Sequence, residues 1–304
     1  MLNKDDIRRY SRQLLLNEID EEGQSNLRSA HAVVIGLGGL GTLASRFLVG
    51  AGVGNITLID GDIVEVSNLQ RQVTYNETHL GDLKAKALSN ELHKVDPSIH
   101  ITSKSLFACK RNLQKLIGSA TCVLDCTDSV AIRKDINAAC IAAKKPLFIA
   151  AASGLSWQAI NLPCHSFLAS AHQLAPSSHC TSENHHSSET DYSSGTDYSS
   201  QTDHADHVNQ QCQPPNVSSK VDAPCGCYDC LVAQLNVTQD CRSQGVLGPV
   251  VGIAACHQAT QALLFLAKRH TATIQWGRYI VGNAIDASVQ SFHLPPSPDC
   301  KVCQ

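Results

Sequence analysis

The sequence predicts an α/β fold in which helices cover both faces of a doubly wound, mostly parallel sheet. Two observations lead to this prediction: short apolar stretches alternate with longer helical ones, and a glycine-rich turn joins the first such pair. Strands that alternate with helices imply right-handed crossovers between parallel neighbours. Hydrophobic residues make up 43% of the 304 residues, which is enough for a sizeable core.

The strands and helices follow one another regularly along the first half of the chain. Residues 32–35 form an apolar strand that glycines end, and residues 40–50 fit a helix. A helix over 83–95 stops at Asp96 and Pro97, because proline disfavours a helical conformation in the residue before it. The other predicted strands are 55–60, 100–102, 122–126 and 146–150, and the other helix is 130–144.

A change in composition divides the chain into parts 1–164, 165–224 and 225–304. The middle part contains thirteen serines, seven of the 14 histidines, and seven acidic residues against one lysine. A six-residue pattern repeats within it, first as TDYSSG and then as TDYSSQ. Because few large apolar side chains are present, burial does not offset the entropy of ordering this segment. We predict a disordered insertion in a single folded domain.

Charge and hydropathy exclude several classes of protein. The formal net charge is −3, which argues against a protein that coats nucleic acid or an anionic membrane. The amino terminus has no apolar run behind its charges, so it is not an export signal. Polar residues such as His257 and Gln258 interrupt the most apolar stretch, 246–267, so we predict no membrane span. We expect a cytoplasmic protein with mostly reduced thiols.

The glycine-rich turn predicts a Rossmann-like nucleotide site. Residues 36–41 (GLGGLG) match the pattern G-x-G-x-x-G directly after a strand and at the start of a helix. Glycines permit close approach of the backbone to phosphate, and the helix amino terminus favours the anion. Asp60 ends the next strand, 19 residues after Gly41, where a carboxylate reaches ribose hydroxyls. The motif alone does not distinguish NAD or FAD from ATP, so a dinucleotide-dependent oxidoreductase stays open at this point.

The charged residues that follow favour a triphosphate. Residues 67–72 (SNLQRQ) and then Lys84 come after Asp60, and an arginine and a lysine there neutralise phosphoryl oxygens during nucleotidyl transfer. Asp128 lies just past the strand 122–126, at the edge of the sheet where ligands bind. A carboxylate at this place can hold magnesium against phosphates.

Together these motifs resemble the ubiquitin-activating-enzyme-like family, in its ThiF/MoeB/HesA group. The resemblance rests on several motifs in family order and covers both flanks of the insertion, roughly 5–159 and 227–304. The motifs are RYSRQ at 9–13, the glycine turn at 36–41, AGVG at 51–54, SNLQRQ at 67–72 and DCTD at 125–128. The resemblance implies an ATP- and magnesium-dependent adenylyltransferase that charges a ubiquitin-like sulfur carrier protein.

The resemblance also implies the roles of individual residues. Arg12 would reach into the active site of the partner subunit, which implies a homodimer, whereas the residue pattern alone favours a surface cation. The family has asparagine where this chain has Ser129, which puts that contact with the nucleotide in doubt. The implied catalytic residues are Arg12, Arg71, Lys84, Asp128 and Cys241, and the implied nucleotide-binding residues are Gly38, Gly39, Gly41, Asp60, Ser67, Asn68, Leu69, Gln70, Arg71, Lys84, Asp128 and Ser129.

Two pairs of cysteines have the spacing of metal ligands. Cys227 and Cys230 form one C-x-x-C pair, and Cys300 and Cys303 form another, with 69 residues between the pairs. Four thiolates suit a tetrahedral structural zinc, although redox-active or free thiols stay open on spacing alone. The family resemblance favours zinc, and the C-x-x-C spacing favours Cys227 over the neighbouring Cys225. Four further cysteines lie among apolar residues and are predicted to be core side chains: Cys122, Cys126, Cys140 and Cys256.

Cys241 begins a loop that distinguishes branches of the family. Arg242 beside it would lower the pKa of the thiol, although an inert thiol is equally compatible with the residues. The segment 241–252 (CRSQGVLGPVVG) resembles the thiamine-pathway branch, in which this cysteine takes part in sulfur transfer. The resemblance therefore favours adenylation of a thiamine-type carrier, followed by a sulfur donor such as a cysteine desulfurase or rhodanese. The alternatives are a molybdopterin-type carrier and an inactive scaffold that binds the carrier.

Overall fold

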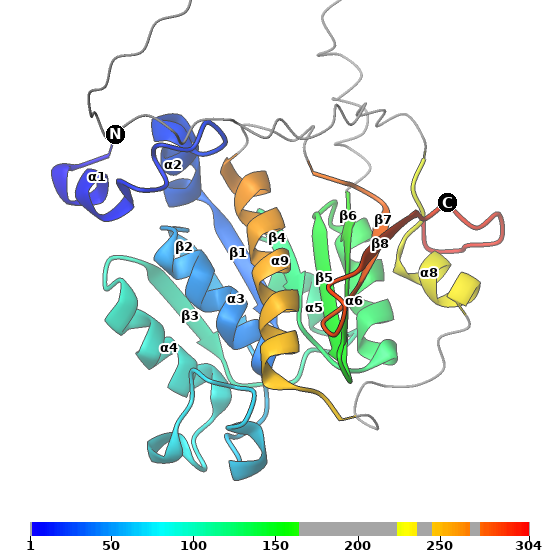
Figure 1. Cartoon of the computed structure of the whole chain (residues 1–304), viewed down its shortest axis with the longest axis horizontal. Helices are drawn as coiled ribbons and strands as arrows, with labels where there is room; N and C mark the ends of the chain where they lie inside the picture. The colour runs from blue at the N-terminus through cyan, green and yellow to red at the C-terminus, as the bar shows by residue number, and fades with distance from the viewer. Residues whose placement is uncertain (1, 164–223, 236–244, 268–273, 304) are drawn as a thin grey trace, which may run out of the picture.

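The computed structural model describes residues 2–163, 224–235, 245–267 and 274–303, and these form one eight-stranded sheet with helices on both faces (Figure 1). The strands are β1 His31–Ile35, β2 Asn55–Ile59, β3 His100–Lys104, β4 Cys122–Asp125, β5 Leu147–Ser153, β6 Ser156–Leu162, β7 Arg278–Asn283 and β8 Val289–His293. The α-helices are α1 Lys4–Tyr10, α2 Asp20–Ser29, α3 Gly39–Gly50, α4 Lys84–Val95, α5 Leu113–Ile117, α6 Val130–Ala142, α8 Tyr228–Leu235 and α9 Gly248–Ala267. Two short 3-10 helices, η1 Val66–Asn68 and η2 Glu77–His79, lie between β2 and α4.

The sheet has a parallel half and an antiparallel half. The strand order is β3-β2-β1-β4-β5-β6-β7-β8. Strands β1 to β5 pair in parallel, whereas β6, β7 and β8 pair antiparallel. Strands β2 and β3 lie on one side of β1, and the chain then crosses to the other side of β1 to form β4 and the later strands. The strand order therefore reverses between β1 and β4. The predicted doubly wound α/β fold is confirmed.

Alternate residues of the central strands enter two separate cores. Val34 of β1 and Leu124 of β4 face one core, where α2, α3, α4 and α9 contribute side chains. Val33 and Val123, one position away in the same strands, face the other core with α5, α6 and α8. This alternation follows from the two-residue period of a strand. It explains why β1 and β4 are apolar apart from His31 and Asp125 at their ends, as expected of parallel strands covered on both faces.

Helix α9 is the central helix of the first face. It is the one helix, among those described, that is long and apolar enough to cross a membrane. In the structure it packs against α3 and against β5 and β6 (Figure 1). The polar Gln258 within it is 1% exposed and donates hydrogen bonds from Nε2 to the carbonyl oxygens of Asp125 at 3.0 Å and Phe148 at 2.8 Å. The apolar character of α9 is therefore that of a core helix.

The predicted core cysteines divide into three that are buried and one that is not. Cys122, Cys126 and Cys140 are buried, as predicted. Cys256 is exposed, so its assignment to the core is wrong. Its neighbour Ala255 is buried, and the helical period of α9 turns position 256 away from the sheet. An apolar helix gives no periodic signal that separates its buried face from its exposed one.

Candidate active site

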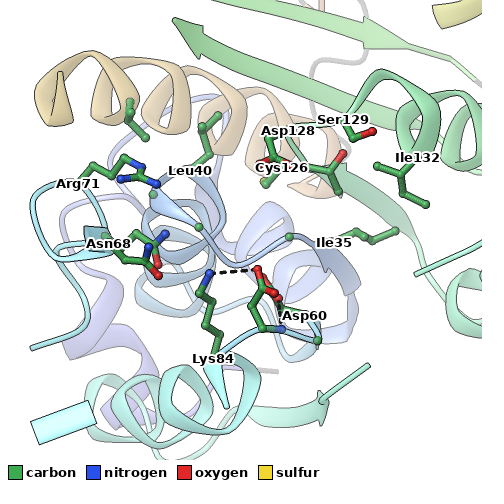
Figure 2. Close-up of a pocket in the computed structure, with 18 of the residues that line it drawn as sticks. Ile35, Leu40, Asp60, Asn68, Arg71, Lys84, Cys126, Asp128, Ser129 and Ile132 are labelled. Carbon is green, nitrogen blue, oxygen red and sulfur yellow. Dashed lines mark hydrogen bonds and ion pairs between the residues drawn. The ribbon is translucent and has the colours of Figure 1, made fainter. Parts of the chain in front are cut away.

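A cavity of about 960 Å³ lies at the carboxyl ends of the parallel strands. It sits where the strand order reverses between β1 and β4, which is the usual ligand position in doubly wound sheets. Figure 2 shows side chains from several elements approaching the same space. Predicted site residues that line the cavity are Gly38, Gly39, Asp60, Asn68, Gln70, Arg71, Lys84, Asp128 and Ser129.

The glycine turn after β1 is held tightly against its neighbours. Gly36 has a φ of +88°, and a Cβ there would lie 2.8 Å from the carbonyl oxygen of Cys126. A Cβ at Gly39 would lie 2.7 Å from the side chain of Val251. Both positions therefore require glycine. Helix α3 then begins without a side-chain cap. No capping side chain therefore accepts hydrogen bonds from the N–H groups of its first turn, and these groups can bind an anion in the cavity.

Asp60 fixes the same turn from β2. One carboxylate oxygen accepts a hydrogen bond from the N–H of Leu37 at 2.7 Å, and the other accepts from the N–H of Asp62 at 2.8 Å. Each oxygen keeps a further lone pair. The carboxylate is thus oriented by the backbone and can still accept from hydroxyl groups of a ribose.

The cationic side chains of the site have different surroundings. Lys84 is 6% exposed, and its Nζ lies 3.4 Å from a carboxylate oxygen of Asp62, which is itself exposed. Arg71 is half-buried and donates to the carbonyl oxygen of Ser67 at 3.0 Å. A buried ammonium costs free energy unless it is paired. A bound triphosphate would supply Lys84 with further negative charge beyond the exposed Asp62.

Asp128 follows β4 at the opposite side of the cavity (Figure 2). The turn that carries it is fixed by Asp125, whose Oδ1 accepts from the N–H and the hydroxyl of Thr127 at 2.9 and 2.7 Å. Burial raises the pKa of Asp125, and the nearby guanidinium of Arg133 opposes this shift. Asp128 itself is exposed. The buried carboxyl therefore shapes the turn, whereas the exposed one faces the ligand space.

A second cavity of about 450 Å³ adjoins the first. Asp128, Arg133 and Ala151 line both cavities. Tyr279 of β7 donates from its hydroxyl to Oε1 of Gln158 at 2.6 Å on the wall of the second one. The two cavities together form a path from the antiparallel half of the sheet to Asp128.

Several residues that line the first cavity were missed by sequence reasoning. Arg133 is 7% exposed, and its Nε donates to the carbonyl oxygen of Thr127 at 3.1 Å. Gln72 is 3% exposed, and its Oε1 has no hydrogen-bond partner. Phe107 is exposed and lies over Gly61. The position of Arg133 in the second turn of the helix after Asp128 was a signal available in the sequence; nothing singled out Phe107.

Other predicted site residues lie away from the cavity or outside the described residues. Gly41, Ser67 and Leu69 do not line it; a Cβ at Gly41 would overlap the carbonyl oxygen of Gly36, so this glycine permits close packing of helix and turn. Arg12 is exposed in the turn after α1. Cys241 lies outside the described residues, as does the predicted insertion 165–224 up to residue 223.

The four predicted metal-binding cysteines come together at the far side of α6. Their sulfur atoms all lie within 4.8 Å of one another. Neighbouring sulfur pairs are separated by 4.0 Å (Cys227 and Cys230), 3.7 Å (Cys227 and Cys300) and 3.6 Å (Cys230 and Cys303). Zinc–sulfur bonds of about 2.3 Å in a tetrahedron place sulfurs about 3.8 Å apart. The donor set therefore fits zinc, and Cys225 is not part of it.

Hydrogen bonds and burial shift the pKa values of the clustered thiols in different directions. The N–H of Ser297 donates to the sulfur of Cys230 at 3.3 Å. Burial acts against ionisation of Cys300, but hydrogen bonds from the backbone of Val302 and Cys303 lower the pKa of its thiol to about 7. Burial raises the pKa of the Cys227 thiol to about 11. Metal binding would deprotonate the remaining thiols.

Comparison with known proteins identifies the family. The model of the ThiF family matches residues 10–302. The chain belongs to the ThiF family. The match spans both halves of the sheet and three of the four clustered cysteines, Cys227, Cys230 and Cys300. The resemblance found in the sequence motifs is confirmed.

Relatives of this ThiF-family chain carry two kinds of name. It is 31% identical to the sulfur carrier protein ThiS adenylyltransferase of Escherichia coli, over 99% of this chain and 97% of that protein. It is 29% identical to the molybdopterin-synthase adenylyltransferase of Salmonella typhimurium, over 99% and 98% of the two chains. These names match the predicted enzyme class, adenylyltransferase.

Solved structures share the fold. The crystal structure of E. coli MccB with ATP superposes with a TM-score of 0.69 at 20% identity, covering 100% of this chain and 75% of that one. The structure of MccB with SeMet MccA gives a TM-score of 0.69 over 99% of this chain and 75% of that one. At this level of identity the likeness supports the fold alone.

Proposed function

We propose that this protein adenylates the carboxyl-terminal glycine of a ubiquitin-like sulfur carrier protein, with ATP and magnesium as co-substrates. The observation that carries the proposal is the convergence of Asp60, Arg71, Lys84 and Asp128 on one cavity, which a second cavity joins at Asp128. The first cavity has the groups that a nucleoside triphosphate requires. The second offers a route for a peptide carboxylate to reach it.

The reaction follows from the positions of these groups. The N–H groups of the first turn of α3 bind phosphate, and Asp60 accepts hydrogen bonds from the ribose. The carrier carboxylate attacks the α-phosphorus of ATP and pyrophosphate leaves. Arg71 and Lys84 stabilise the negative charge on the phosphate oxygens. No general base is needed, because a carboxyl group is ionised near neutral pH.

Asp128 would hold the magnesium ion, which neutralises phosphate charge when it is bound. Its carboxylate is exposed to the shared space of the two cavities. Ser129 lies beside it, where the family has asparagine, and lines the same cavity with a shorter side chain. Gly38, Asn68 and Gln70 complete the lining on the nucleotide side.

Zinc would be bound by Cys227, Cys230, Cys300 and Cys303 in a purely structural role. All four ligand positions would be occupied by thiolates, so no position stays open for a substrate. Cys241 is the residue that we propose for sulfur transfer after adenylation, with a cysteine desulfurase or rhodanese as the sulfur donor. Adenylation releases pyrophosphate, and attack of the donor sulfur on the acyl adenylate releases AMP. When the donor sulfur is that of a persulfide, this attack gives an acyl disulfide, and a second thiol then displaces the carrier thiocarboxylate and is itself oxidised to a disulfide.

We favour a thiamine-type carrier. The support is the segment CRSQGVLGPVVG at 241–252, which resembles the thiamine branch, and the 31% identity to a ThiS adenylyltransferase. A molybdopterin-type carrier is the alternative, because relatives with that name are 29% identical. We place the reaction in the cytoplasm, which agrees with the free thiols of the described cysteines.

We further propose a homodimer in which Arg12 of one subunit completes the active site of the other. Arg12 is exposed, and it does not line the cavity of its own chain. Large apolar side chains around it are exposed as well: Ile7 by 46%, Leu15 by 76% and Leu16 by 51%. Burial of such a patch against a second copy would remove apolar surface from water.

The test is ATP–pyrophosphate exchange with a thiamine-type carrier, with a molybdopterin-type carrier and without a carrier. We expect exchange with the thiamine-type carrier only. Exchange with only the molybdopterin-type carrier would show that the protein acts on the alternative carrier. Absence of exchange with both carriers, in zinc-replete protein, would contradict the proposal and leave the motifs as evidence of fold alone.

A further inference from the structure

Helix α6 connects the proposed nucleotide site to the cluster of four cysteines, Cys227, Cys230, Cys300 and Cys303. Its amino-terminal end follows Asp128 directly, with Ser129 as the N-cap residue. Arg133, in the next turn, donates from Nη2 to the carbonyl oxygen of Ala150 at 3.3 Å. One turn later, on the same face, comes Asn137, which is 1% exposed. A single rigid element therefore begins at the proposed magnesium ligand and passes the cysteine cluster.

Asn137 holds the first cysteine pair through both ends of its amide. Its Nδ2 donates to Oδ2 of Asp229 at 2.8 Å, and its Oδ1 accepts from the N–H of Tyr228 at 3.3 Å. Tyr228 and Asp229 are the two residues between Cys227 and Cys230. A buried amide that satisfies both its donor and its acceptor on one short loop fixes the orientation of that loop.

The same loop builds a wall of the second cavity. Helix α8 starts at Tyr228, and its residues Tyr228, Leu231 and Val232 line that cavity together with Asp128 and Arg133 from the start of α6. Leu231 and Val232 pack in one core with Ile136 of α6 and with Cys300 of the cluster. A shift of the first cysteine pair would therefore move α8 relative to α6 and change the space beside Asp128.

We propose that Asn137 is a positioning residue for the zinc site. Its side chain holds the loop of the first cysteine pair, Cys227 and Cys230, against α6 as a clamp, and this contact links zinc occupancy to the geometry of α6 near Asp128. Outer hydrogen-bond partners of a metal site typically change metal affinity or activity about 10- to 100-fold when they are lost. The metal-site part stands on the contacts of Asn137; the link to Asp128 rests on the proposed function through the role of that residue.

The test uses an exchange of the two side chains. Asn137→Asp places a carboxylate against Asp229 and removes the amide donor, so we expect zinc to pass to a colorimetric chelator about tenfold faster or more. Asn137→Asp combined with Asp229→Asn restores a donor and an acceptor with the same net charge, and we expect release within about threefold of the unchanged protein. Ile136→Val, in the same core but without a side-chain hydrogen bond to the loop, is the matched control and should release zinc at the unchanged rate.

The second readout is the affinity for magnesium and ATP without any carrier, measured by calorimetry on the zinc-loaded proteins. We expect about fivefold weaker binding for Asn137→Asp and recovery in the double variant, as for an outer-shell change felt at the other end of α6. Unchanged zinc release in Asn137→Asp, or no recovery in the double variant, would overturn the clamp. Faster zinc release with unchanged nucleotide affinity would overturn the link along α6.

Two further controls separate failures. If Asn137→Asp does not fold, as judged by circular dichroism, Asp229→Ala removes the same hydrogen bond from the loop side, and zinc release from it decides the clamp. If the zinc and nucleotide readouts behave as expected and no carrier supports pyrophosphate exchange, the proposed carrier reaction is wrong and the inference on Asn137 stands.

Discussion

The parallel half of the sheet and its antiparallel half differ in burial and in the chemistry that they carry. In the parallel half, all residues of β4 and all but the first of β1 are buried, and the glycine turn, Asp60 and Asp128 follow directly after such strands. In the antiparallel half, every residue of β8 is exposed, and β6 and β7 contribute Gln158 and Tyr279 to the second cavity. The nucleotide site thus lies at the ends of buried central strands, and the proposed route of the carrier runs past β6 and β7, next to the exposed edge strand β8.

This difference teaches how the fold separates two recognition tasks. A nucleotide needs fixed backbone N–H groups and charges, which rigid strand ends supply. A protein partner needs accessible surface, which the edge of the sheet supplies. Changes in the parallel half should therefore affect every reaction that uses ATP, whereas changes in the antiparallel half should affect only reactions that use the carrier.

The largest expected effect is that of Asp128→Ala. Pyrophosphate exchange should fall by at least about 100-fold, because the carboxylate that we propose for magnesium would face the phosphates of bound ATP. The side chain is exposed, so the free energy of unfolding should change by no more than about 0.5 kcal/mol. Zinc content, measured on the same preparation, is the control. Normal exchange in this variant would remove Asp128 from the mechanism.

Mixing of inactive subunits tests whether the parallel half forms a complete site on its own. Arg12→Ala and Asp128→Ala should each be inactive as homodimers. After subunit exchange, mixed dimers contain one site with both residues intact, so activity should recover to about one quarter of the unchanged protein. Light scattering on the same samples reports the dimer. Failure to recover, with subunit exchange demonstrated by a tagged chain, would place Arg12 outside the active site of the partner.

The parallel half could be predicted from sequence more fully than the antiparallel half, for a physical reason. Strands covered on both faces are rich in apolar residues, so 32–35 and 122–126 coincide closely with β1 and β4. Strands β6, β7 and β8 mix polar and apolar residues such as Gln158, Asn161 and Arg278, and none of them was predicted. Their pairing depends on contacts between segments far apart in the chain, such as Ala159 with Ile280.

In the candidate site, too, residues marked by a local sequence pattern were predicted, and residues that depend on contacts between distant segments were not. Asp60, Lys84 and Asp128 were found because each stands at the end of a strand or the start of a helix that the pattern predicts. Arg133 and Asn137 were missed because a buried polar residue inside a helix looks like any other polar residue until its partners are known. The cysteine cluster is intermediate, because the C-x-x-C spacing singled out the four cysteines that the structure brings together, although 69 residues separate the two pairs.

The same substitution made in each half gives a matched comparison of intermediate size. Tyr10→Phe removes a hydrogen bond from a phenol that is 2% exposed to Oδ2 of Asp96 at 2.9 Å, and the loss should be about 1.5–3 kcal/mol because the acceptor is charged. Tyr279→Phe removes a bond to the neutral amide of Gln158 and should cost only about 0.5–1.5 kcal/mol.

Activity should separate the two tyrosine variants further. Because Tyr279 lines the second cavity, Tyr279→Phe should raise KM for the carrier and leave KM for ATP unchanged. Urea unfolding measures the stabilities, and pyrophosphate exchange at varied ATP and carrier concentrations measures the two constants. An increase in KM for ATP would show that the second cavity is not restricted to the carrier.

The smallest expected effect is a dependence of stability on pH that distinguishes two carboxylates. Burial acts to raise the pKa of Asp96, but hydrogen bonds from Ser98 and Tyr10 together with the charge of Arg9 outweigh it and hold the pKa below its usual 3.8. Since the folded state favours the ionised form, this carboxylate stabilises the protein above the unfolded pKa, and the contribution is lost as the pH falls through the folded value. Asp96→Asn should therefore lower the urea midpoint at pH 7, and the difference from the unchanged protein should shrink below about pH 4.

Asp286 in the antiparallel half also has a lowered pKa, through hydrogen bonds from Ser288, but it is exposed. Asp286→Asn should leave the midpoint unchanged at both pH values, since solvent already satisfies an exposed carboxylate. Equal pH dependence in the two variants would contradict this assignment, in which the stabilisation comes from the buried contact between Tyr10 at the end of α1 and Asp96 just after α4.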